Sequence, residues 1–397
     1  MRRDFDIVIV GAGPAGLAAA IEAKKCNSKA KVAVLEKMEK AGKKLSASGN
    51  GRGNLSNRSC HELDEVLNFF LESGIAIRAD EAGRIYPYSE EAKAVTSALL
   101  KHAKRLGAEI FTDTKVSNVE ADREGGFHIF IEKKQDTFYS KKLLIATGGK
   151  SFAVYGSSGD GFSMAKSFGH SVIPPVPGLT AVEVAESLGD LKGIRAKAEV
   201  SLLVGGQMVF REEGEVQFRD DSISGICVMN LSSKLPSSRE ELSGCKILIN
   251  FVPDFDTMQL KNFISLQAKT TGNTMLDLLE TIVKKPLAMR ILKDASIDGN
   301  QSTQELKGAK LINLLNGLRC FTLSPCGRKG WKEAQVTRGG VTLEEIDYET
   351  MESKLVKGLY FAGELLDLDG YTGGFNLQIA WSTGFVAGNS VLKDVYS

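Results

Sequence analysis

Residues 6–16 read Asp-Ile-Val-Ile-Val-Gly-Ala-Gly-Pro-Ala-Gly, and this stretch decides the fold. Its apolar, β-branched residues at 7–10 are typical of a buried strand. The pattern Gly-x-Gly-x-x-Gly follows at once, and the Ala- and Leu-rich residues 17–25 favour a helix. A second apolar run at 31–35 ends at Glu36. This order of strand, glycine-rich turn, helix, strand and acid predicts a Rossmann-like domain that binds a dinucleotide.

The residue types in this turn suit a bound pyrophosphate. Gly11 permits the tight turn, Gly13 lets the backbone approach the phosphates, and Gly16 lets the helix pack closely on the strand. The N-terminus of the helix presents N–H groups and the positive end of its dipole to an anion. Glu36 lies 20 residues after Gly16, where a carboxylate can accept hydrogen bonds from ribose hydroxyls.

The overall composition limits the class of protein. The chain has 397 residues, more than one hydrophobic core usually serves, so we expect two or three domains. Its 50 Lys and Arg residues balance 49 Asp and Glu residues, which argues against nucleic-acid or membrane-surface binding. We find no apolar run of the roughly 20 residues that span a membrane. The first strand begins too early to leave room for a signal peptide. These features predict a cytoplasmic protein without a membrane or nucleic-acid partner.

The six cysteines are spread along the chain, at Cys26, Cys60, Cys227, Cys245, Cys320 and Cys326. None forms a C-x-x-C pair, and none lies in a Cys/His cluster with zinc spacing. We therefore expect no metal site and no disulfide reductase activity. Scattered cysteines of this kind fit a reducing compartment.

Further glycine-rich segments stand where strands end or helices begin. A long polar loop contains residues 48–54, and an apolar strand leads into the Ala-Thr-Gly-Gly of residues 146–149. Near the C-terminus, Gly363-Glu364 follows another apolar strand, and residues 374–378 begin the last helix. In open α/β sheets the ligand lies in the crevice at the carboxyl ends of the strands. We therefore expect all of these segments to meet one ligand.

Residues 156–161, Gly-Ser-Ser-Gly-Asp-Gly, resemble a second nucleotide-binding turn. No strand directly precedes this segment and no βαβ unit follows it, so we reject that interpretation. The chain then has no second dinucleotide domain, and any nicotinamide cofactor would bind only transiently.

The Pro-rich segment 173–178 forms a stiff linker. Beyond it, short strand patterns and then helical patterns replace the α/β alternation. We predict a discontinuous Rossmann-like domain at 1–187 and 326–397. The insertion would comprise a small β domain at 188–254 and a helical cap subdomain at 255–325.

Seven motifs in this order resemble the BaiN-like flavoproteins, also described as the aminoacetone-oxidase family of FAD-binding enzymes. The resemblance covers nearly the whole chain, and its motifs are residues 8–16, 48–52, 83–87, 146–151, 156–161, 336–341 and 358–378. It implies FAD bound in an extended form. It also implies an α/β fold with a Rossmann-like FAD-binding domain of the glutathione-reductase type and an inserted β-barrel-like plus helical cap domain.

The resemblance also implies where each part of FAD binds. The adenine ribose would lie at Glu36, the pyrophosphate at residues 11–16, and the isoalloxazine along residues 48–54. The residues expected to bind FAD are Gly11, Gly13, Pro14, Ala15, Gly16, Glu36, Lys37, Lys44, Ser48, Gly49, Asn50, Gly51, Arg52, Asn54, Val116, Ala146, Thr147, Gly148, Gly149, Gly363, Glu364, Gly374, Phe375, Asn376, Leu377 and Gln378. The chain departs from the family pattern in three places: Gly53 replaces a cysteine, Phe375 replaces a tyrosine, and the usual Phe-Thr turn of the inserted domain reads Phe218-Arg219-Asp220-Asp221.

The candidates for catalysis are Arg338, Asp369 and Tyr371, which lie in glycine-rich turns that the resemblance places beside the flavin. None of the four histidines stands out as an acid or base. His170 follows a helical segment, where we expect it to interact with the helix dipole.

The sequence and the resemblance together predict an FAD-dependent oxidoreductase that transfers hydride between flavin N5 and a small organic substrate. The favoured reaction is the reduction of a conjugated C=C or C=N bond, with NAD(P)H as a possible transient donor. Two alternatives remain, an O₂-using oxidase of a small amine such as aminoacetone and a non-catalytic FAD-binding redox sensor. The oligomeric state is left open.

Overall fold

The computed structural model describes residues 2–132, 137–236, 238–267 and 272–392. The chain forms two compact units, which we call the first unit (Met1–Pro177 with Gln335–Ser397) and the second unit (Gly178–Ala334). The boundaries expected at 188 and 326 both lie inside the second unit. The division of the insertion into a β domain and a helical subdomain stays a prediction.

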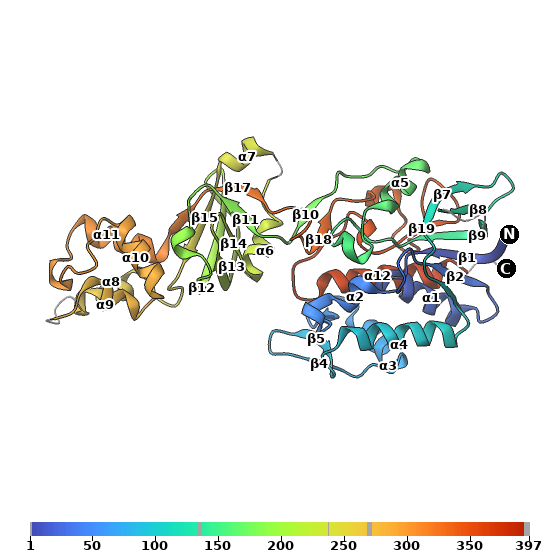
Figure 1. The fold of residues 1–397 in the computed structure, drawn as a ribbon, viewed down its shortest axis with the longest axis horizontal. Helices are drawn as coiled ribbons and strands as arrows, with labels where there is room; N and C mark the ends of the chain where they lie inside the picture. Colours follow the sequence, from blue (N-terminus) through green and yellow to red (C-terminus); the bar gives the residue numbers. More distant parts are fainter. Residues whose placement is uncertain (1, 133–136, 237, 268–271, 393–397) are drawn as a thin grey trace. The chain divides into compact units, whose positions relative to one another are not determined.

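A seven-stranded sheet forms the centre of the first unit (Figure 1). Its strands are β1 (Arg2–Val10), β2 (Val32–Leu35), β6 (Glu109–Phe111), β7 (Val116–Ala121), β8 (Phe127–Ile131), β9 (Thr137–Ile145) and β19 (Leu359–Phe361). The order is β6-β2-β1-β9-β8-β7, with β19 also paired to β9. The pairs β2–β1, β1–β9, β9–β19 and β2–β6 are parallel. This arrangement confirms the Rossmann-like fold predicted from residues 6–36.

The register brings the carboxyl ends of the parallel strands to one edge. Val10 lies opposite Leu35 on β2 and Ile145 on β9, and Phe361 lies opposite Ile145. Each of these strands is buried over its final residues, as expected for a sheet covered on both faces. The segments that follow the strands therefore meet at a common edge.

Helices and short strands complete the first unit. They are α1 (Pro14–Cys26), α2 (Lys43–Ser46), η1 (Ser48–Gly51), β3 (Ser56–Asn57), α3 (Leu63–Glu72), β4 (Ile77–Ala79), β5 (Arg84–Pro87), α4 (Ala92–Arg105), η2 (Ala153–Tyr155), α5 (Asp160–Ser167), β18 (Val336–Arg338), η5 (Leu343–Glu345), η6 (Gly363–Leu365) and α12 (Phe375–Ser390). The short strand β10 (Val176–Gly178) ends at the first residue of the second unit. Strands β3, β5 and β4 form a small antiparallel sheet. The predicted polar loop after Glu36 thus contains two short helices, α2 and η1.

The second unit contains an antiparallel seven-stranded sheet in the order β16-β15-β12-β13-β14-β11-β17. These strands are β11 (Val182–Val184), β12 (Arg195–Val204), β13 (Gln207–Phe218), β14 (Ser222–Ser224), β15 (Cys245–Asn250), β16 (Phe321–Leu323) and β17 (Pro325–Arg328). Its helices are η3 (Gly189–Leu191), α6 (Ile226–Ser232), α7 (Arg239–Ser243), α8 (Thr257–Gln267), α9 (Met275–Glu280), α10 (Lys285–Asp294), η4 (Thr303–Glu305) and α11 (Ala309–Arg319). The unit has a hydrophobic core of its own.

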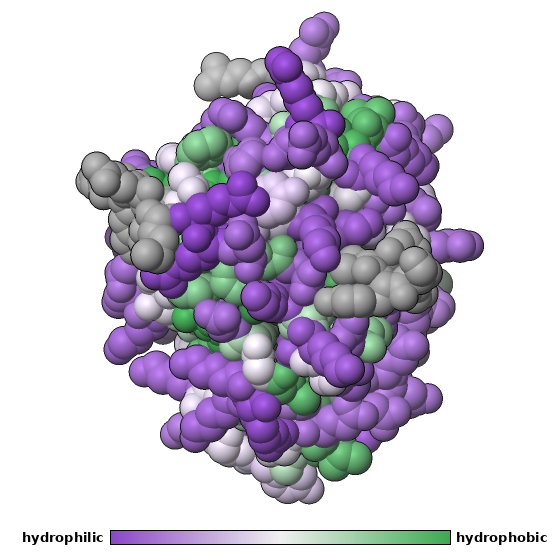
Figure 2. Space-filling model, turned by 90° about the vertical axis from the view of Figure 1, so that its right-hand side faces the viewer, coloured by the Kyte–Doolittle hydropathy of each residue, from purple (hydrophilic) through white to green (hydrophobic). Residues whose placement is uncertain are grey.

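The surface seen in Figure 2 is mostly hydrophilic, with hydrophobic side chains in small separate areas. Among the helices of the described residues, none has the length and apolar character needed to cross a lipid bilayer.

Helices α1 and α12 pack with their backbones in close contact. A Cβ atom added at Gly384 would lie 2.6 Å from the carbonyl oxygen of Ala15, and one at Gly388 would lie 2.6 Å from that of Ala19. Real Cβ atoms do not approach backbone oxygens so closely, so only glycine fits at both positions of α12.

We expect Gly388→Ala to lower the free energy of unfolding by about 1–3 kcal/mol, as measured by urea titration, because the added methyl group overpacks the α1–α12 contact. This loss should appear even though alanine favours a helix over glycine by about 1 kcal/mol. The control is Gly330→Ala, at a glycine where an added Cβ atom meets no atom within 4 Å, which should change stability by about 0.5 kcal/mol or less. Equal stability of Gly388→Ala and the native protein would contradict the close packing.

Candidate functional site

The glycine-rich turn after β1 combines two tight contacts with one open position. Gly11 has a φ of 110°, and a Cβ atom there would lie 2.4 Å from the carbonyl oxygen of Ala146. A Cβ atom at Gly16 would lie 1.9 Å from the carbonyl oxygen of Gly11. At Gly13, the N-cap of α1, an added Cβ atom would meet no atom within 4 Å.

The open position at Gly13 is the feature that fits a phosphate. Pro14 is the first residue of α1, and no side chain of the described residues caps this helix. The N–H groups of its first turn therefore stay available to an anion, beside a glycine whose missing side chain leaves room for it. The residues present fit the pyrophosphate of FAD.

Glu36 lies at the end of β2 and points back to the same turn. Its Oε2 accepts a hydrogen bond from Ala12 N (3.1 Å) and its Oε1 accepts one from Met38 N (2.9 Å). Burial raises the pKa of Glu36 above its usual value, and these backbone N–H groups oppose the rise. The N–H of Thr114 donates to the carbonyl oxygen of Glu36 (2.9 Å), which brings the segment leading to Val116 close to the turn.

Lys37, the next residue, is paired with an acid. Its Nζ lies 2.5 Å from Oδ2 of Asp160, at the start of α5, and also donates to Ser158 Oγ. Burial acts to raise the pKa of Asp160, but the Lys37 ammonium, together with Ser158 and the charge of Lys115, lowers it below its usual value. The motif at 156–161 is therefore held beside the end of β2 by a charged contact.

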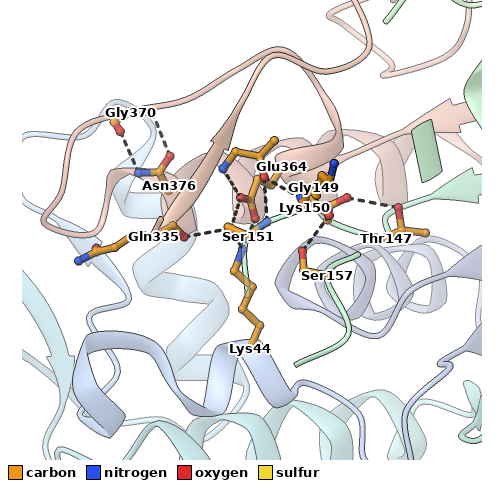
Figure 3. A network of polar contacts seen from close by, with 12 residues as sticks. Lys44, Thr147, Gly149, Lys150, Ser151, Ser157, Gln335, Glu364, Gly370 and Asn376 are labelled. Carbon is orange, nitrogen blue, oxygen red and sulfur yellow. Dashed lines mark hydrogen bonds and ion pairs between the residues drawn. The ribbon is translucent and has the colours of Figure 1, made fainter. Parts of the chain in front are cut away.

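Lys44, Ser151 and Glu364 form the centre of a polar network (Figure 3). The Lys44 Nζ donates to Ser151 Oγ (2.8 Å) and to Glu364 Oε2 (2.5 Å). Ser151 Oγ lies 3.0 Å from Glu364 Oε1 and 3.2 Å from the carbonyl oxygen of Gln335. The network therefore joins α2, the segment after β9 and η6, which are far apart in the sequence.

Thr337 on β18 adds a backbone connection to this network. Its N–H donates to Glu364 Oε1 (2.7 Å), and its Oγ1 accepts from the N–H groups of Lys150 (2.7 Å) and Ser151 (3.2 Å). A Cβ atom at Gly149 would lie 2.3 Å from Thr337 Oγ1. Glycine at 149 is thus required for the contact.

The remaining residues of the predicted strand ends lie at the same edge. The N–H of Ala146 donates to the carbonyl oxygen of Val10 (2.9 Å). Thr147 lies between Ala146 and Gly148, which has a φ of 72°. Figure 3 shows Thr147 and Gly149 beside the network. A Cβ atom at Gly363 would lie 3.0 Å from the Cβ atom of Ala15, so η6 packs against α1.

The loop 48–54 is tightly wound. Gly49 and Asn50 are both left-handed, with φ values of 56° and 55°, and Gly51 also has a positive φ. Ser48 Oγ donates to the carbonyl oxygen of Leu45 (2.7 Å). The backbone N of Asn54 would lie 2.8 Å from a Cβ atom at Gly49.

Arg52 is the charged residue of this loop. Its Nε lies 2.8 Å from Glu90 Oε2, and its guanidinium lies 4.6 Å from the centre of the Tyr86 ring. The side chain is half exposed. Arg52 therefore forms an ion pair with Glu90, within the protein itself.

The start of α12 is fixed by the segment 54–61. Gly374 has a φ of 108°, and a Cβ atom there would lie 2.2 Å from the carbonyl oxygen of Ser56. Gln378 accepts from Ser56 Oγ (2.6 Å) and donates to the carbonyl oxygen of His61 (3.0 Å). As in α1, no side chain of the described residues caps the helix. The first residues of α12, Phe375 to Leu377, therefore begin a second helix with available N–H groups.

Asn376 fixes the turn before this helix. Its Oδ1 accepts from Gly370 N (3.0 Å), and its Nδ2 donates to the carbonyl oxygens of Gly370 (2.9 Å) and Tyr371 (3.1 Å). Figure 3 shows Asn376 and Gly370 facing each other. The amide thereby fixes the backbone of the turn at residues 370–371, which precedes α12.

Two of the catalytic candidates are brought together. Arg338 ends β18, and its Nε lies 3.5 Å from Asp369 Oδ1. Tyr371 belongs to the turn that Asn376 holds, and its residue is 40% exposed. A group with this exposure can reach a substrate.

Sequence reasoning missed Ser151 and Thr337 as residues of the network. Both stand in motifs that were recognised, Ser151 as the last residue of 146–151 and Thr337 as the second residue of 336–341, so the signal was a polar side chain within each motif. Which atom each hydroxyl contacts depends on the tertiary fold.

We expect Gly13→Val to yield a folded protein that has lost FAD, measured as flavin absorbance per chain with circular dichroism as the test of folding. Gly13 has a φ of −81°, and a Cβ atom there meets no protein atom, so the substitution takes up ligand space alone. The control is Gly330→Val in the second unit, also at an open position, which should keep its FAD. A Gly13→Val protein with full flavin content would overturn the pyrophosphate site.

Comparison with known proteins identifies the family of the chain. The family model described as the HI0933-like protein Rossmann domain matches residues 5–68 and 59–390. The 3-dehydro-bile acid delta(4,6)-reductase of Clostridium scindens is 33% identical, over 98% of this chain and 99% of the relative. The ribosomal RNA dihydrouridine synthases of Haemophilus influenzae and Escherichia coli are each 28% identical. The alignments cover 97% and 98% of this chain, respectively, and 98% of each relative.

Among solved structures, the 3-ketosteroid-delta4-(5alpha)-dehydrogenase of Rhodococcus jostii RHA1 shares the fold, with a TM-score of 0.52. Its identity is 15%, over 99% of this chain and 97% of that chain. The chain therefore belongs to the HI0933-like Rossmann-domain family and is an FAD-dependent oxidoreductase of the BaiN-like type that its motifs predict.

Proposed function

We propose that this protein reduces a carbon–carbon double bond conjugated to a carbonyl group in a small organic substrate, with NADH or NADPH as the electron donor. The relative from C. scindens is named a delta(4,6)-reductase of a 3-dehydro-bile acid. In such a compound the double bond at carbon 4 is conjugated to the oxidised carbon 3, and the double bond at carbon 6 extends that conjugation. Formation of dihydrouridine, the reaction in the name of two other relatives, also saturates a double bond conjugated to a carbonyl. This shared chemistry, in relatives that match almost the whole chain, is the observation that carries the proposal.

When bound and reduced by NADH or NADPH, FAD would supply a hydride to the carbon β to the carbonyl group. The protein must then stabilise negative charge on the carbonyl oxygen and deliver a proton to the α carbon. Hydride and proton together add two electrons and two hydrogens across the double bond.

We assign these two tasks to the catalytic candidates. A guanidinium keeps its proton in proteins, whereas a phenol can give one. Arg338, oriented by the Asp369 carboxylate 3.5 Å away, would bind the carbonyl oxygen. The exposed Tyr371 would donate the proton. In support, Arg338 directly follows Thr337, whose N–H donates to Glu364, and Tyr371 lies in the turn that Asn376 holds before α12.

The substrate class favoured here is a small molecule rather than RNA. The chain has 50 basic and 49 acidic residues, whereas nucleic-acid binding depends on an excess of basic groups that contact phosphates. RNA remains an outcome that the experiment below distinguishes.

The test is an anaerobic titration of the FAD-loaded protein, followed by flavin absorbance. We expect NADH or NADPH to bleach the flavin and a 3-oxo-Δ4 steroid or a related small enone to restore its colour with formation of the saturated product. If neither NADH nor NADPH bleaches the flavin, the proposal that one of them is the electron donor is wrong.

Restoration only by a uridine-containing ribosomal RNA transcript would overturn the small-molecule substrate. Rapid restoration by O₂ with no response to any enone or RNA would overturn the reductase and support an oxidase.

We expect Tyr371→Phe to slow reoxidation of the reduced flavin by the enone about 10²- to 10⁴-fold, measured by stopped flow. Reduction by NAD(P)H should be unchanged, because that half-reaction needs no proton on the enone. The control is Tyr348→Phe, another exposed tyrosine of the first unit, which should leave both rates unchanged. Reoxidation of Tyr371→Phe at the native rate would rule out Tyr371 as the proton donor.

A further inference from the structure

His170 lies between a carboxylate and a hydroxyl in the interior of the first unit. Its side chain is fully buried, with Nδ1 3.0 Å from Glu345 Oε2 and Nε2 2.7 Å from Ser353 Oγ. The ring of Phe361 on β19 packs edge-to-face against the imidazole, with centroids 4.7 Å apart. This differs from the helix-dipole role expected from the sequence.

The hydrogen bonds of Ser353 determine which nitrogen of His170 carries the proton. Ser353 Oγ accepts from the N–H groups of Leu355 (3.0 Å) and Val356 (2.9 Å), which occupy both of its lone pairs. Its own proton must therefore go to His170 Nε2, which has to be an unprotonated acceptor. The proton of the neutral imidazole is then on Nδ1 and is donated to Glu345.

The order Ser, His, Glu also occurs in hydrolases, but Ser353 is not placed to act as a nucleophile. The residue is only 6% exposed, and both lone pairs of its hydroxyl oxygen are in use. A nucleophilic serine must present that oxygen to a substrate. Ser353, His170 and Glu345 therefore have a structural role, fixing the segments that carry them, and not a nucleophilic one.

The segment held in this way leads directly to the FAD site. The N–H of Ser353 donates to the carbonyl oxygen of Leu359 (2.7 Å), the first residue of β19. β19 pairs with β9 and continues into Gly363 and Glu364. On the other side, Glu345 accepts from the N–H of Ser171 (2.9 Å).

We propose that Glu345, His170 and Ser353 form a proton-sensitive lock that positions β19 and Glu364, so that protonation of His170 weakens FAD binding. A proton on Nε2 would face a hydroxyl oxygen with no lone pair left, and the bond to Ser353 breaks. Ser353 is then no longer held by His170, and its backbone hydrogen bond to Leu359, which positions β19 and the following Glu364, weakens. The inference concerns FAD binding and does not depend on which substrate is reduced.

The charges around His170 set the direction of the effect. Within the part of the chain that the structure describes, Glu345 on η5 is the charged group that acts on it, and Ser353 and Phe361 are uncharged neighbours. Burial lowers the pKa of His170 below its usual value, and Glu345 partly opposes this. The folded state favours the neutral ring. The contribution of His170 to the free energy of unfolding is therefore fully present above about pH 6.5, the pKa of histidine in an unfolded chain. It falls as the pH drops below that value toward the folded pKa.

A second group in the site also responds to acid. Burial raises the pKa of Glu36, which faces the predicted FAD ribose, so its protonation would weaken FAD binding independently. A test must separate the two groups.

The experiment measures the FAD dissociation constant by flavin fluorescence between pH 5 and 8. Histidine protons are followed by NMR in the same range, where the four histidines of the chain give few signals. For the native protein we expect the dissociation constant to rise by up to about tenfold per pH unit below the His170 transition. His170→Gln, which cannot be protonated, should lose this rise and keep only the part that belongs to Glu36.

Glu345→Gln provides a variant in which His170 remains. Removing the carboxylate should move the His170 transition, and the rise in dissociation constant with it, to lower pH. His128→Gln, at a partly exposed histidine in β8, is the control and should leave the profile unchanged.

A His170→Gln protein with the native pH profile would overturn the lock, as would a His170 signal that titrates without any change in FAD affinity. If His170→Gln fails to fold, the Glu345→Gln shift decides alone, and its absence would overturn the proposal. An inactive protein with these pH shifts intact would instead count against the proposed reduction.

Discussion

Close contact between backbones at the start of α1 is the constraint on which the first unit depends. Gly16 approaches the Gly11 carbonyl, and Gly11 approaches the Ala146 carbonyl, at distances that exclude any side chain. These contacts let β1, β9 and α1 meet at one edge of the sheet. Gly13, two residues after Gly11, faces open space instead. The same turn is therefore closed where the fold needs packing and open where a phosphate needs room.

A second level of organisation comes from polar contacts between segments that are distant in the sequence. Glu364 receives a Lys44 ammonium from α2, the N–H of Thr337 from β18 and a contact from Ser151 after β9. Half-buried charges are stable when they are paired and hydrogen-bonded, and costly when one partner is missing. The network thus makes the geometry of the cofactor edge depend on four separate pieces of chain. His170 is connected to the same edge through its hydrogen bond with Ser353, whose N–H in turn donates to Leu359 at the start of β19.

Several charged residues that the motifs place near FAD are paired within the protein. Lys37 contacts Asp160, and Arg52 contacts Glu90. Their assignment to FAD stays a prediction, because a motif identifies a charged side chain and its approximate place but not its partner. The pair of Arg338 and Asp369 likewise joins two turns that lie far apart in sequence.

The sequence by itself determined the Rossmann-like fold, the family and the segments that line the cofactor edge, because glycine spacing and apolar strand patterns reflect local backbone geometry. It placed the start of the last helix within residues 374–378, and the structure begins that helix at Phe375. Only the tertiary structure decided how Ser151, Thr337 and Glu364 contact one another, and that the side chain of His170 contacts Glu345 and Ser353. The hydrogen bonds of Ser151 to Thr337 and Glu364, and those of His170, each join residues separated by more than a hundred positions. Their partners are set by how strands align in space, which residue spacing along the chain does not encode.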